Sequence, residues 1–203
     1  MTLAITEMID AVYDVSGDTL PSHYAFPLWH ELVRHVPTLA SDPSIGVIPF
    51  KTAPSEAGLL LAKRAKLTIR LPASLASHAS ALNGKQLNID GVSLQLGASK
   101  LKSIQSFTTL HSNLVASNDE SEEQFLANVT KKLTELGAVG DLLCGLHGTM
   151  STRDRTIRGF SLVIHNMKAE PSLRLQYLGL GADRQFGCGI FVPYKTITDL
   201  RDE

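Results

Sequence analysis

The chain has 203 residues, which is enough for one large domain or two small ones. Hydrophobic residues make up 43% of the chain and charged residues 19%, and the formal net charge is -1, so nucleic-acid binding would have to rest on local basic patches. No apolar run is long enough to span a bilayer, and the N-terminus lacks the basic and apolar regions of a secretory signal. We therefore expect a cytoplasmic globular protein without a membrane partner.

The first half of the chain predicts the element order β-α-β-β-α-β. Leu28, Leu32 and Val36 recur at helical spacing, while Leu67, Ile69 and Leu71 alternate with polar residues as in a half-buried strand. The predicted elements are a strand (3–15), a helix opened at Pro21 or near Pro27 and stopped by Pro37, strands (44–50 and 58–71), a short helix from Pro72 to about Leu82, and a strand (86–96).

The second half predicts the same order. Ser121 and Gln124 resemble a capping box at a helix start, and Gly137 is typical of a helix end. The predicted elements are a strand (103–116), a helix between Ser121 and Gly137, a strand pair (142–150 and 156–167), a helix (172–177) opened by Pro171, and a strand (187–193). The fold class is therefore α+β, with two tandem ferredoxin-like (βαββαβ) domains over residues 1–98 and 99–203. No low-complexity linker divides the halves, so we expect them to pack together.

A glycine-rich loop in the second domain stands out. It contains two Gly-x-Gly units, Gly179 with Gly181 and Gly187 with Gly189, separated by five residues that include Arg184. Glycines let backbone come close to a ligand, and successive backbone amides form anion-binding concavities. A strand rather than a helix follows, so a dinucleotide loop is excluded. The loop predicts contact with a phosphate chain near Arg184; the alternative is a tight turn leading into a closing strand.

Basic residues gather around this loop and in the preceding hairpin. Arg153, Arg155 and Arg158 lie with several hydroxyl residues in the turn and strand after Met150, and they predict a strip of phosphate donors. A solvated hairpin tip is the equal alternative. Arg174 and Lys195 flank the glycine loop and are expected to extend its positive surface.

The first helix carries two candidate catalytic residues, His23 and His30. A histidine near neutral pH can take a proton from a ribose 2′-hydroxyl or give one to the departing 5′-oxygen. Such chemistry cleaves RNA without a metal ion, because the nucleophile is the 2′-oxygen of the substrate. Surface or capping histidines are the alternative interpretation of each.

Cofactor sites have little support in the sequence. Cys144 and Cys188 are far apart and form no CxxC unit, and the seven histidines show neither HxxxH nor HExxH spacing. We therefore expect reduced cysteines, no metal and no other cofactor.

The C-terminal run from Gly179 to Pro193 resembles the glycine-rich loop of the CRISPR-associated repeat endoribonucleases of the RAMP superfamily. Residues 172–176 resemble the helix before that loop, and residues 20–28 resemble the family's entry into the first helix. The resemblance implies metal-independent cutting of precursor CRISPR RNA at the repeat stem-loop or its flank, 2′,3′-cyclic phosphate ends, and retention with other subunits in a Cascade-type complex. It also implies a first-helix histidine as acid or base, without deciding between His23 and His30.

Two alternatives remain at this point. One is a related subunit that binds repeat RNA without cutting it. The other is a small-molecule enzyme or regulatory module on a ferredoxin-like scaffold, because a fold does not by itself determine function.

Overall fold

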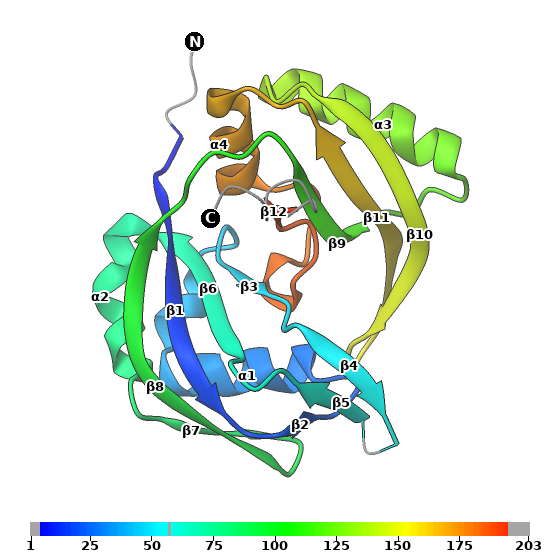
Figure 1. Ribbon diagram of the computed structural model, residues 1–203. Helices are drawn as coiled ribbons and strands as arrows, with labels where there is room; N and C mark the ends of the chain where they lie inside the picture. The colour runs from blue at the N-terminus through cyan, green and yellow to red at the C-terminus, as the bar shows by residue number, and fades with distance from the viewer. Residues whose placement is uncertain (1–4, 57, 195–203) are drawn as a thin grey trace.

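Two antiparallel sheets, one from each half of the chain, form the framework of the protein (Figure 1). The computed structural model describes residues 5–56 and 58–194. The first sheet has the strand order β3-β6-β1-β8-β7, and the second has the order β10-β11-β9-β12. A small third sheet, β2-β5-β4, extends from the first half. The fold is thus a mixed α+β fold with antiparallel sheets.

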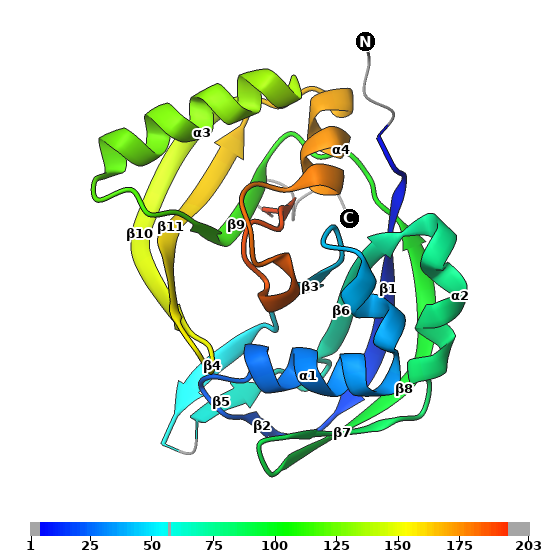
Figure 2. The same ribbon diagram turned by 180° about the vertical axis from the view of Figure 1, so that it is seen from behind.

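The first half contains β1 (Met8–Ser16), β2 (Thr19–Leu20), α1 (Ala25–His35), β3 (Gly46–Ile48), β4 (Thr52–Ser55), β5 (Gly58–Leu61), β6 (Lys66–Pro72), α2 (Ala76–Ala79), β7 (Gln86–Ile89) and β8 (Val92–Ser103). Both α1 and α2 lie on one side of the first sheet (Figure 2). Leu28 and Leu32 of α1 are buried in its core, as their helical spacing predicts. Pro27 falls in the first turn of α1, where its missing N–H costs no helical hydrogen bond.

Two strands predicted as continuous are in fact interrupted. The predicted strand 58–71 is divided by residues 62–65 into β5 and β6, and β5 pairs with β4 in the small sheet. The predicted strand 86–96 is the hairpin β7–β8, which turns at Asp90 and Gly91. These two residues have φ values of 48° and 87°. Asp-Gly is a favoured pair in such tight hairpin turns because both residues tolerate positive φ.

The second half contains β9 (Leu110–Ala116), α3 (Glu122–Leu136), β10 (Asp141–Ser151), β11 (Thr156–His165), α4 (Ala169–Leu178) and β12 (Val192–Pro193). The predicted ends of α3 are confirmed: the Ser121 side chain accepts the Gln124 N–H (3.3 Å), and Gly137 takes the left-handed conformation. The predicted closing strand 187–193 is shorter, since the chain becomes a strand only at Val192.

The halves are joined through β8 and one buried arginine. Strand β8 pairs with β1 as far as Ser103, so the predicted division after residue 98 falls within this strand. Arg70 of β6 is 1% exposed, and its Nε and Nη2 donate to the Asp10 carboxylate (2.8 and 3.0 Å). Its Nη1 donates to the carbonyl oxygens of Gln176 (3.1 Å) and Phe191 (2.8 Å) in the second half. Arg70 therefore ties the first sheet to the second half.

No helix within the described ranges is both long enough and apolar enough to cross a membrane.

Candidate active site

A pocket of about 470 Å³ opens where α1 meets the tip of the β10–β11 hairpin. Figure 2 shows this tip beside the N-terminal end of α1. The pocket is lined by His23, Phe26, Pro27, His30, Glu31, Asn88, Asp90, Ser151, Thr152 and Arg153. The structure therefore brings both predicted histidines together with one of the three predicted hairpin arginines, although they come from different halves.

The two histidines are held in different ways. His23 precedes α1, and its Nε2 lies 2.9 Å from Oδ2 of Asp90; their side chains are 59% and 54% exposed. The His30 ring lies 5.4 Å from the Phe26 ring, one helical turn away. Phe26 also contacts Phe186 of the glycine-rich loop, with ring centroids 5.9 Å apart. The loop thus supports the helix that carries His30.

The glycine-rich loop itself is mostly packed inside the protein. Gly179, Gly187 and Gly189 are buried, whereas Gly181 is exposed. Gly189 accepts the Leu180 N–H (3.0 Å) and donates its own N–H to the Leu114 carbonyl (2.7 Å). At these three buried positions the glycines allow close passage of neighbouring backbone, and their amides do not form an open cradle for phosphate.

Gly189 offers a direct test of this packing. A methyl group there would lie 1.8 Å from the Leu180 carbonyl oxygen, and its φ of 62° is unfavourable for other residues. We expect Gly189→Ala to lower the free energy of unfolding by about 2–3 kcal/mol, measured by chemical denaturation. Gly84→Ala is the matched control, because Gly84 has a similar φ of 66° and open space around it. It should cost only about 1 kcal/mol, and equal losses would contradict the packing argument.

The Arg184 side chain, predicted to lie near a phosphate chain, is turned inward. It is 4% exposed, and Nη1 donates to the carbonyl oxygens of Tyr177 (3.0 Å) and Leu178 at the end of α4. Burial lowers the pKa of Arg184 to about 10, so the guanidinium remains charged at neutral pH. A buried cation on the last carbonyl groups of a helix stabilises that helix end. Contact between Arg184 and an RNA backbone stays a prediction, which this burial does not favour.

Arg174 also serves a helix end. Its Nη1 donates to the Leu136 carbonyl oxygen (3.1 Å) at the end of α3, and its Nη2 donates to the Glu170 carboxylate (2.7 Å). Its contribution to a positive surface at the glycine-rich loop stays a prediction, with two of its guanidinium nitrogens bound in these contacts. Lys195, the other flanking residue, lies outside the described residues.

The remaining hairpin arginines lie beside the exposed part of the loop. Arg155 forms an ion pair with Asp183 of the loop. Arg155 and Arg158 line a hollow of about 550 Å³ together with Ala182 and Asp183. Both arginines are exposed. The predicted strip of phosphate donors is thus divided: Arg153 faces the histidines, and the other two lie next to the loop.

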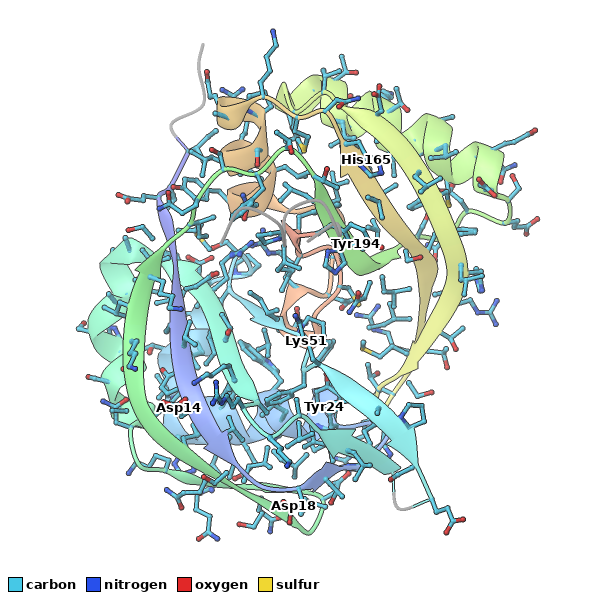
Figure 3. The ribbon with its side chains drawn as sticks, in the orientation of Figure 1. Asp14, Asp18, Tyr24, Lys51, His165 and Tyr194 are labelled. Carbon is cyan, nitrogen blue, oxygen red and sulfur yellow. The ribbon has the colours of Figure 1, made fainter. Side chains whose placement is uncertain are left out.

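A larger hollow, of about 880 Å³, lies between the halves, and no sequence motif marks it. Its lining includes Lys51, His111 and Asn113. The His111 ring lies 5.2 Å from the Tyr194 ring, and burial lowers the pKa of His111. Figure 3 shows Lys51 and Tyr194 in the region between the two sheets. Scattered single residues of this kind leave no recognisable sequence pattern.

Comparison with known proteins identifies the family. The family model described as "Cas6 Crispr" matches residues 9–196. The chain belongs to the Cas6 family. The Cas6 assignment is also supported by a curated relative, the CRISPR-associated endonuclease Cas6 of Myxococcus xanthus (strain DK1622). It is 30% identical over 186 residues, covering 91% of this chain and 81% of the relative.

Solved structures of Cas6-related proteins share the fold. A Cas6-related protein of Pyrococcus furiosus superposes with a TM-score of 0.63 at 15% identity, over 94% of this chain and 99% of that one. Thermus thermophilus Cse3, solved with an RNA representing a pre-cleavage complex, gives a TM-score of 0.52 at 12% identity, over 93% of this chain and 100% of that one. At such low identity the likeness concerns the fold.

Proposed function

We propose that this protein is an endoribonuclease that cuts precursor CRISPR RNA within the repeat to give mature CRISPR RNA. The observation that carries the proposal is the pocket in which His23 and His30 of the first half meet Arg153 of the second. Two potential proton-transfer groups and a phosphate-binding cation are the parts needed to cleave a ribose–phosphate chain. Membership of the Cas6 family supports this assignment of substrate.

We also propose that the halves are two tandem ferredoxin-like units. Their strand orders support this. When β7 at the far edge of the first sheet is left aside, each sheet has its first strand between the third and the fourth and its second at one edge, as β3-β6-β1-β8 and as β10-β11-β9-β12. Because β8 continues to Ser103 and β9 begins at Leu110, the division between the units is best placed within residues 104–109.

The proposed reaction needs no metal ion. The ribose 2′-oxygen attacks the adjacent phosphorus while His23 accepts the 2′-hydroxyl proton, and His30 donates a proton to the departing 5′-oxygen. Arg153 stabilises the charge that develops on the phosphate oxygens. The products are a 2′,3′-cyclic phosphate and a 5′-hydroxyl end.

The hairpin arginines are proposed to hold the RNA backbone. We expect Arg153→Ala to weaken repeat binding and to reduce the slope of log K against log salt by about 0.7–0.9, since one phosphate contact is lost. Fluorescence anisotropy over a series of salt concentrations measures both. Arg64→Ala removes the same charge from a position outside the pocket, and the proposal requires that its effect on the slope be smaller.

One experiment tests the function as a whole. The protein is incubated with the repeat RNA of its own genomic neighbourhood in EDTA, and the ends of the products are mapped. Cutting at one position with cyclic phosphate ends is the expected result. Tight binding without cutting would instead indicate a repeat-binding subunit, and absence of salt-dependent binding would reject both roles.

We further propose that the protein acts in the cytoplasm and retains its product beside other subunits of a Cascade-type complex. Co-purification of the protein with these subunits and the cut RNA tests the retention.

A further inference from the structure

The β7–β8 turn is built around a carboxylate that meets His23. The backbone of the turn is bound to α1, because the Asn88 N–H donates to the Glu31 carboxylate (3.1 Å). A second hydrogen bond lies within the turn, where the Gly91 N–H donates to the Asn88 side chain (2.7 Å). Asp90 has a positive φ of 48°, a conformation that aspartate tolerates better than most residues. The turn therefore has a defined position relative to α1.

Glu31 is itself fixed. Arg34 donates to both of its carboxylate oxygens (2.8 and 2.9 Å). This hydrogen bonding lowers the pKa of Glu31 to about 2, so the residue is an anion at neutral pH and a strong acceptor for the Asn88 amide. The contacts thus link Glu31 of α1 to the turn, and Asp90 of the turn to His23, which lies two residues before α1.

Stability does not explain this arrangement well. The His23 and Asp90 side chains are both more than half exposed, and exposed ion pairs contribute little to folding. What the contact does fix is the histidine ring. A carboxylate accepts a hydrogen bond from the neighbouring ring nitrogen, which leaves the other nitrogen unprotonated in the neutral imidazole.

We propose that Asp90 is a positioning residue for His23: it accepts the Nε2 proton and leaves Nδ1 free as the base. The inference rests on the proposed function. In the reaction the 2′-hydroxyl proton moves to Nδ1, the bond between the 2′-oxygen and phosphorus forms, and the bond from phosphorus to the 5′-oxygen breaks. The imidazolium produced on His23 lies beside the Asp90 carboxylate, and His30 supplies the proton of the leaving group.

The test compares Asp90→Asn with the wild type. Asparagine tolerates the same backbone conformation, so the turn is kept while the charge is removed. We expect kcat to fall about 10- to 100-fold with KM within about twofold of wild type. Asp18→Asn, which changes an exposed aspartate outside the pocket, should leave both unchanged. The double variant His23→Ala/Asp90→Asn should cut no more slowly than His23→Ala, because Asp90 acts through His23.

A spectroscopic measurement separates this inference from the function it rests on. In ¹H–¹⁵N spectra of the histidine rings, protonated and unprotonated nitrogens are well resolved, so the His23 tautomer is observed without RNA. We expect the Nε2–H form in the wild type and a mixture in Asp90→Asn. An Nδ1–H form in the wild type, or unchanged kcat in Asp90→Asn beside an inactive His23→Ala, overturns the inference. Absence of cutting by the wild type with the Nε2–H form present overturns the function and leaves the positioning intact.

Discussion

Cutting of the repeat RNA should fall by about 100-fold or more when His23 and His30 are both changed to alanine, because general acid–base catalysis contributes that much to such reactions. Both side chains line the pocket that Arg153 enters from the other half. Binding of the repeat should change much less, since neither histidine need be charged to hold a phosphate. Single-turnover cleavage in EDTA gives the rate, and each single variant shows how the effect divides between the two residues.

The matched control for these variants is His165→Ala. His165 lies at the end of β11 opposite the hairpin tip and contacts Thr109 (3.3 Å). This variant should cut as fast as the wild type. If the double variant at His23 and His30 also did so, the first-helix histidines would have no part in catalysis and the proposed chemistry would be wrong, even though the protein would remain a Cas6 family member.

The second large effect concerns stability. Arg70→Ala should lower the free energy of unfolding by about 3–5 kcal/mol, the usual loss when one partner of a buried ion pair is removed. It leaves Asp10 without its guanidinium and two carbonyl groups of the second half without a donor. Denaturant unfolding measures the loss.

A second pair across the same two strands provides the comparison. Lys66 pairs with Asp14 just as Arg70 pairs with Asp10, in the same β1–β6 register. The Lys66 and Asp14 side chains, however, are both exposed. Lys66→Ala should therefore cost less than about 1 kcal/mol. Similar losses in the two variants would show that the contact between the halves contributes nothing beyond an ordinary surface pair.

The elements that local signals define were predictable from the sequence. The ends of α3 are correct because Ser121 and Gly137 carry the capping information within the helix itself. The break between β5 and β6 was missed because apolar residues continue on both sides of residues 62–65. The β7–β8 turn was missed although Asp90-Gly91 is a recognisable hairpin signal. The contact of this turn with His23 depends on tertiary packing, which no local signal encodes.

The residues of the candidate site could be named from the sequence, but their assembly into one pocket could not. His23 lies just before α1 and His30 within it, so their proximity follows from one short stretch of chain. Their meeting with Arg153 depends on how the halves pack, which no local pattern encodes. For Arg184, nothing in the sequence indicated the burial of its side chain. A positive charge among glycines suggests exposure, and only the position of the α4 carboxyl end reveals that its guanidinium is turned inward.

The continuation of β8 to Ser103 has a consequence for how substrate is captured. Because only residues 104–109 connect β8 to β9 and Arg70 is bound to both halves, we expect the halves to have little freedom to rotate relative to one another. Such a preorganised receptor loses little conformational entropy on association. The adjustment on binding then falls mainly to the flexible nucleic acid, and the association rate should be set by diffusional encounter rather than by a closing motion of the enzyme.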